Sequence, residues 1–137
     1  MVARGLRNNN PGNIRKGGRS PFEGEIVPSA DSAFRQFRTM DYGYAAMFVL
    51  LAVYLTTGRN TIERIIRSWA PPVENNTLAY IGKVERLSGV LRAKVLTVND
   101  GESIIKIVAA MSEVENAVKA DMTSIKRGFL LQNKIRR

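Results

Sequence analysis

The sequence contains neither cysteine nor histidine, and this limits the chemistry that it can perform. Without cysteine there are no disulfides and no thiolate metal ligands, and without histidine the commonest general base and metal ligand is missing. Phosphate-binding glycine loops, nucleotide-binding glycine patterns and nucleophile elbows are missing as well. The sequence therefore predicts no metal and no cofactor, and any acid–base chemistry must come from carboxylates, lysine or tyrosine.

Long hydrophobic runs are also scarce. The longest covers residues 44–55, which are all apolar, and it falls short of the ~20 residues that a helix needs to cross a bilayer. The amino-terminal residues 1–7 lack the apolar core of a signal peptide. We therefore expect no transmembrane segment and no signal peptide.

Positive charge exceeds negative charge along the whole chain. The 137 residues include 21 Lys and Arg against 12 Asp and Glu, which gives a formal net charge of +9. This length fits a single domain, residues 1–137, with a positive field over its surface. The partner could be nucleic acid, an anionic membrane face or an anionic cell-wall polymer. Nucleic acid is less favoured, because the aromatic residues lie in apolar runs and are not interleaved with Lys and Arg.

The hydrophobic pattern predicts a mainly α fold of the α+β class. A helix over about 41–57, capped near Asp41, is apolar all round and should be buried at the centre. Alternating residues over about 22–38 predict a small β-hairpin or three-stranded sheet. Further helices are predicted over about 60–70, 77–88 and 102–118. The basic segment 119–137 is predicted to form a C-terminal helix that could dock on a partner.

An asparagine-rich stretch, residues 7–15 (RNNNPGNIR), predicts a shaped loop. Asparagine competes for the backbone, proline lacks a donor, and glycine loses the most entropy on ordering. The loop presents amides that both donate and accept hydrogen bonds, which suits a ligand rich in hydroxyls and acetamides, or a polyanion. Alternatively, these amides bond their own backbone. The flanking cations are Arg4, Arg7, Arg15, Lys16 and Arg19.

Glu115 is the strongest candidate for a proton-transferring group. It falls on the apolar stripe of the helix predicted over 102–118, whereas Glu113 falls on the wet face. Apolar surroundings disfavour the charged carboxylate and raise its pKa, so that it holds a proton near neutrality as a general acid must. The alternative is an ordinary helix-end or salt-bridged glutamate.

A second carboxylate would complete the usual arrangement of a glycoside hydrolase. The candidates are Glu23 and Glu25 in the predicted hairpin, with Asp31 and Glu74 as further acids. Taken alone, each of these acids is better interpreted as a solvated surface charge. Among the aromatic residues, Tyr80 is the best candidate to line a cleft, while Trp69 and the remaining tyrosines are interpreted as core or rim.

Three segments resemble one family. Residues 4–15, 34–37 and 69–80 (WAPPVENNTLAY) look like a group of phage and prophage proteins often labelled virion structural proteins, which are similar to lysozyme-like peptidoglycan-cleaving enzymes. In those enzymes the catalytic glutamate ends a helix that precedes the Asn-Pro-Gly-Asn-type loop. Residues 110–117 (AMSEVENA) resemble that helix ending, displaced to the carboxyl side. The resemblance, which covers about residues 4–90, therefore implies a circularly permuted lysozyme-like domain with Glu115 as its acid.

The resemblance also implies roles for the loop and a setting for the protein. Asn9, Asn10, Asn13 and Asn116 would bind the sugar's acetamide and hydroxyl groups, and Tyr80 would line the cleft. The substrate would be the glycan strands of peptidoglycan, cleaved as by a muramidase or a lytic transglycosylase, with other virion proteins as further partners. The protein would reside in a virion or in the bacterial cytoplasm and be delivered to the periplasm. This arrangement requires residues near 10 to contact residues near 115.

One residue departs from the family pattern. Ala117 stands where the pattern has glycine, so the helix could run on through Lys119, and alanine is compatible with the site unless a left-handed backbone is needed. Two alternatives to the enzyme follow. One is a virion protein that keeps the fold without catalysis and binds glycan, DNA or neighbouring subunits. The other is a DNA-binding module that uses the C-terminal cations.

Overall fold

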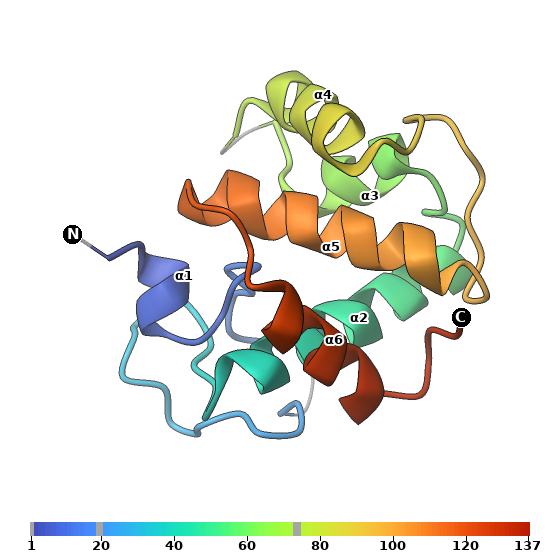
Figure 1. Cartoon of the computed structure of the whole chain (residues 1–137). Coiled ribbons are helices and arrows are strands. Elements are labelled where there is room, and N and C mark those ends of the chain that lie inside the picture. The colour runs from blue at the N-terminus through green and yellow to red at the C-terminus, as the bar shows by residue number, and fades with distance from the viewer. Residues whose placement is uncertain (1, 19–20, 73–74) are drawn as a thin grey trace.

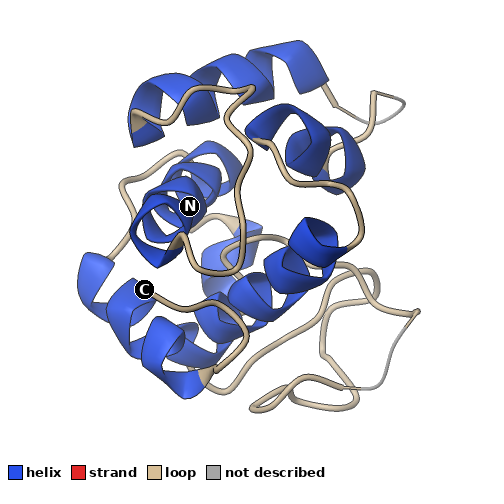
Figure 2. Ribbon diagram, turned by 90° about the vertical axis from the view of Figure 1, so that its right-hand side faces the viewer, coloured by secondary structure: helices blue, strands red, loops and turns tan. Residues whose placement is uncertain are grey.

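The computed structural model of the chain describes residues 2–18, 21–72 and 75–137. It is mainly helical, as predicted, and regular strands do not occur in these ranges (Figures 1 and 2). The helices are α1 (Arg4–Arg7), α2 (Met40–Thr56), α3 (Ile62–Trp69), α4 (Thr77–Ser88), α5 (Gly101–Asn116) and α6 (Met122–Leu131). Figure 1 shows α5 crossing the middle, with α3 and α4 on one side and α2 and α6 on the other.

Helix α2 is the buried central helix that its composition predicts. Met47, Phe48 and Leu51 have no exposed surface, because helix α6 packs along one side of α2 and α5 also contacts it. Its N-cap is Thr39, whose side chain accepts a hydrogen bond from the amide of Tyr42, and not Asp41 as expected. Asp41 lies in the first turn instead, where a negative charge favours the helix dipole.

The expected hairpin over about 22–38 is not formed as regular strands. Two isolated antiparallel bridges replace it, Arg15 with Phe34 and Glu25 with Phe37. The backbone of residues 33–38 bonds alternately to residues 14–16 on one side and 24–26 on the other. Tight turns interrupt both flanks, because Gly24 has a φ of +75° and the Asp31 carboxylate bonds the amides of residues 33 and 34. Neither flank is therefore straight enough to extend a ladder.

Helix α4 packs against both α5 and α3. The N-cap of α3 is Thr61 and that of α4 is Asn76, so both helices begin close to the predicted residues 60 and 77. Helix α5 ends at Asn116 and does not run on through Lys119, since Ala117 takes the left-handed conformation with a φ of +59°. The last turn of α5 therefore closes beside α1 and the asparagine-rich loop (Figure 1).

The C-terminal segment is shorter as a helix than the predicted 119–137. Helix α6 begins after its cap Asp121 and ends at Leu131, and the last residues return across the start of α5. There Gly101 N donates to Arg136 O, and Arg136 N donates to Val98 O. Gly101 and Val98 thus hold the carboxyl end against the body of the protein. Within the described ranges, the helices are each too short or too polar to cross a membrane.

Candidate active site

The end of helix α5 and the asparagine-rich loop meet, as the sequence predicted. Asn13 Nδ2 donates a hydrogen bond of 2.8 Å to Glu115 Oε1. One residue further on, Asn116 Nδ2 donates to Pro11 O and to Ser112 O, both at 2.9 Å. The bond to Pro11 O ties the end of α5 to the loop, whereas the bond to Ser112 O stays within α5. The left-handed turn at Ala117 lets the chain leave without disturbing either bond.

Glu115 is held by two donors and partly shielded from water. Besides Asn13, the hydroxyl of Tyr80 donates to Glu115 Oε2 at 2.9 Å. Burial raises the pKa of the Glu115 carboxyl, while the hydrogen bonds from Asn13 and Tyr80 pull that pKa down again. Burial has the larger effect, so the net direction is upward. Glu115 is thus an acid whose protonated form is favoured relative to a glutamate in water.

Tyr80 supports the acid from helix α4 and does not line an open cleft. Its side chain is only 6% exposed, and burial, together with the charge of Glu115 and the bond to it, raises the pKa of the phenol. A phenol with a raised pKa stays protonated and remains a hydrogen-bond donor. We therefore describe Tyr80 as a residue that positions Glu115, where the sequence suggested a cleft wall.

Of the three loop asparagines predicted to bind sugar, one faces the acid and two shape the loop. Asn10 is fully buried, and its amide bonds Ile14 N, Ile14 O and Arg35 O. Asn9 donates to the carbonyls of residues 37 and 38. The side-chain amides of Asn9 and Asn10 therefore bond backbone, which was the alternative to ligand binding. Only Asn13 turns its amide toward Glu115.

Two amide oxygens beside the acid are buried without a hydrogen-bond partner in the described structure. They belong to Asn13 and Asn116. Both pack against Gly5 of α1, where an added Cβ would approach each of them closely. Glycine at this position therefore lets α1 press against the amides that orient the site. The role of Asn116 is to hold the loop, and it does not face a ligand as expected.

Glu115 opens into a small polar pocket of about 140 Å³. Trp69 lies on its wall, and its Nε1 donates to Gly12 O at 3.1 Å. The sequence predicted Trp69 to lie in the core or rim, because this residue continues the apolar stripe of α3. Trp69 faces a pocket because the asparagine-rich loop docks against it. The other lining residues are Gly12, Asn13, Arg15, Phe34, Ala70 and Asn75.

The candidate second carboxylates do not join Glu115. Glu25 is committed to Arg35 in a buried ion pair of 2.6 Å, in which the two side chains are 7% and 4% exposed. Glu23 is exposed on the surface and borders a different pocket. Asp31 binds Arg4 and Asn8, and the Arg4 bond holds the pKa of Asp31 far below its ordinary value. Glu74, like the cation Arg19, lies outside the described residues.

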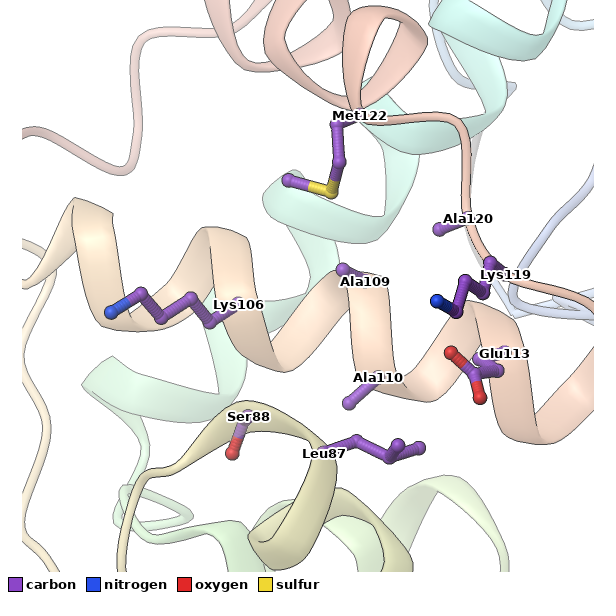
Figure 3. Close-up of a pocket in the computed structure, with 9 residues that line it drawn as sticks. All are labelled: Leu87, Ser88, Lys106, Ala109, Ala110, Glu113, Lys119, Ala120 and Met122. Carbon is purple, nitrogen blue, oxygen red and sulfur yellow. The ribbon is translucent and has the colours of Figure 1, made fainter.

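Another pocket, of about 400 Å³, lies on the other face of α5, away from this site. Figure 3 shows Ala109 and Ala110 of α5 between Leu87 on one side and Met122 on the other. Glu113 is the acid here, which agrees with its predicted place on the opposite face of α5 from Glu115. The described residues contain no cluster of carboxylates that could hold a metal ion, in this pocket or elsewhere.

The chain is similar to a phage protein. Protein P5 of Pseudoalteromonas phage PM2 is 40% identical over 132 residues, which cover 93% of this chain and 81% of that protein. No protein-family model matches the chain.

Proposed function

The chain belongs to the family of Protein P5 of Pseudoalteromonas phage PM2, and we propose that it is a phage or prophage enzyme that cleaves the glycan strands of peptidoglycan. The observation that carries the proposal is the contact between Glu115 and Asn13, residues 102 positions apart in the chain. It places an acid with a raised pKa against an amide-bearing loop, in a polar pocket. The pocket thus holds the acid that cleavage of a glycosidic bond requires, and the amide of Asn75 lies on its wall.

The proposed domain is a circularly permuted lysozyme-like one. In the resembling enzymes the glutamate helix precedes the loop, whereas here α5 follows it. The arrangement of α5 against the loop and α2 supports this interpretation, because the permutation changes the chain order and leaves the neighbours in space unchanged. The short bridges at residues 15, 25, 34 and 37 would stand in place of the small sheet.

In the proposed reaction, protonated Glu115 donates its proton to the glycosidic oxygen as the bond to the anomeric carbon breaks. The anomeric carbon is then attacked by an oxygen, either of water or of the same sugar's own hydroxyl. In the second case Glu115, now a carboxylate, takes the proton of that hydroxyl as the anhydro ring closes, and returns to its starting state. We favour this transglycosylase route because the described residues place no second carboxylate beside Glu115.

Zymography on purified peptidoglycan tests the proposal with two matched variants. We expect clearing by the natural protein, loss of clearing in Glu115→Gln, and retained clearing in Glu113→Gln, which removes the same charge from the opposite face of α5. Products that end in an anhydro sugar would identify the transglycosylase, and new reducing ends the muramidase.

Other outcomes would contradict the proposal in different ways. Full clearing by Glu115→Gln would reject Glu115 as the acid. No clearing by the natural protein, provided that it is folded, would favour a non-catalytic virion protein that keeps this fold. In the proposed setting the protein is carried in the virion or released to the periplasm, where its positive surface holds it near anionic wall polymers.

A further inference from the structure

A second pocket adjoins the Glu115 pocket and differs from it in chemistry. It has a volume of about 390 Å³ and shares Asn13, Arg15 and Trp69 with the acid's pocket. The rest of its wall is mostly apolar and comes from Ile14, Leu50, Tyr54, Ser68 and Pro71. The two pockets thus meet along one edge formed by Asn13 and Trp69.

The wall of the second pocket is rigid where it meets the acid's pocket. The rings of Tyr54 and Trp69 pack edge to face with their centroids 6.1 Å apart. The guanidinium of Arg59 lies 4.0 Å from the centre of the Tyr54 ring, and Trp69 is fixed by its bond to Gly12 O. A side chain held on several sides loses little entropy when a ligand binds, so this corner is preorganised.

We propose that the second pocket binds the stem peptide of peptidoglycan, the short alanine-containing peptide that branches from the lactyl group of alternate sugars. This inference rests on the proposed function of the Glu115 pocket. A peptide that branches from a sugar held at Glu115 must leave sideways from the glycan, and it enters a pocket that shares an edge with the acid's pocket.

The lining favours a peptide over another sugar ring. A sugar ring carries hydroxyls around its rim, and burying them against Ile14, Leu50 and Pro71 without partners is costly. Alanine methyl groups gain free energy when they are buried in such a wall. Peptide amides at the pocket mouth remain in contact with water and can also bond the exposed Ser68 hydroxyl. The positive charge of Arg15 also suits a ligand that carries carboxylates.

The proposal can be tested with a substitution that fills the second pocket from its exposed edge. Ser68 is exposed on α3 and lines the second pocket but not the acid's pocket, so Ser68→Tyr places a ring in the second pocket without disturbing the core. The control is Thr123→Tyr, which adds the same ring at an exposed position of α6 that lines neither pocket. The substrates are intact peptidoglycan and the same material after an amidase has removed its peptides.

We expect the natural protein and Thr123→Tyr to prefer intact peptidoglycan, with kcat/KM about tenfold higher than for the stripped glycan, as a pocket worth about 1.4 kcal/mol would give. We expect Ser68→Tyr to lose most of that preference. Equal loss on both substrates would instead identify a sugar site, and an unchanged preference would overturn the proposal. No cleavage of either substrate by the natural protein would count against the proposed function.

A binding experiment tests the pocket even without catalysis. Trp69 is the only tryptophan in the sequence and lies on the shared edge, so its fluorescence reports ligands in either pocket. In Glu115→Gln we expect a soluble disaccharide–peptide to change this signal, and Ser68→Tyr in the same background to weaken its binding about tenfold. A chitin oligosaccharide, which has no peptide, should bind both proteins equally. Equal binding of the disaccharide–peptide to both proteins would overturn the proposal.

Discussion

At the scale of single residues, the Glu115 carboxylate is controlled by two side chains that reach it from different parts of the chain. Asn13 and Tyr80 each donate to a different oxygen of the carboxylate. Both bonds favour the charged form, while burial favours the protonated form and has the larger effect on the pKa. Removing either donor should therefore change the pKa of Glu115 while the burial of its carboxyl stays the same.

Replacing Tyr80 by phenylalanine should shift the pH dependence of cleavage. The change removes a donor that stabilises the carboxylate, so the pKa of Glu115 rises further. The proposed acid is active when protonated, and activity is lost as the pH rises through that pKa. In a plot of kcat/KM against pH, the fall in activity at high pH should therefore move to higher pH. Tyr42→Phe, at a tyrosine that packs against Gly24, serves as the control. If the fall in activity stayed at the same pH or moved to lower pH, Tyr80 would not act as a donor that lowers the pKa of Glu115.

Ala117 carries backbone strain that glycine would relieve. Its φ of +59° is unfavourable for a residue with a Cβ. We expect Ala117→Gly to raise the free energy of unfolding by about 1 kcal/mol, measured by urea denaturation. The same substitution inside α5, Ala109→Gly, should lower it by about 1 kcal/mol, because glycine weakens a helix interior. Destabilisation by both changes would show that the left-handed turn is not strained.

At the scale of elements, the crossing of α2 and α6 depends on a glycine. A Cβ at Gly128 would lie 2.7 Å from Asp41 O and 2.8 Å from the Cβ of Tyr44, so backbone and core would have to move. We expect Gly128→Ala to lower the free energy of unfolding by about 1 to 3 kcal/mol, as overpacking of a tight contact does. Thermal and urea unfolding measure the effect.

The matched control for this crossing lies in α4. A Cβ at Gly82 would meet only the Arg92 guanidinium at 3.9 Å. Gly82→Ala should therefore raise the free energy of unfolding by about 1 kcal/mol, through helix propensity alone. If Gly128→Ala were also stabilising, α6 would not be packed on α2 as closely as the structure shows.

At the scale of the whole molecule, the site is assembled from segments far apart in the chain. The loop at residues 9–13, α4 and the end of α5 supply Asn13, Tyr80 and Glu115 respectively. The acid at the end of α5 would lose its orientation if the loop failed to dock, even with α5 intact. The buried pair of Glu25 and Arg35 and the buried amide of Asn10 hold the loop in place. The site therefore depends on the packing of the whole molecule.

Several features follow from the sequence because their causes are local. The burial of most of α2 follows from a helix that is apolar nearly all round, and the inward direction of Glu115 follows from its place on the stripe of α5. The asparagine-rich loop follows from residues that fit neither helix nor strand. Even the contact between the loop and the end of α5 could be predicted, because the resemblance to a permuted domain requires it.

Only the tertiary structure decides which polar groups remain available for a ligand. Asn9, Asn10 and Asn13 are equivalent in the sequence, yet two bond backbone and one faces Glu115. Trp69 looks like any other residue of an apolar stripe until the loop docks against it. The expected hairpin is reduced to two isolated bridges, and one of them pairs Phe34 with Arg15, which lies outside it. Local patterns fix which face of an element is apolar. The partner of each polar side chain is set by residues up to 105 positions away, and no local pattern encodes it.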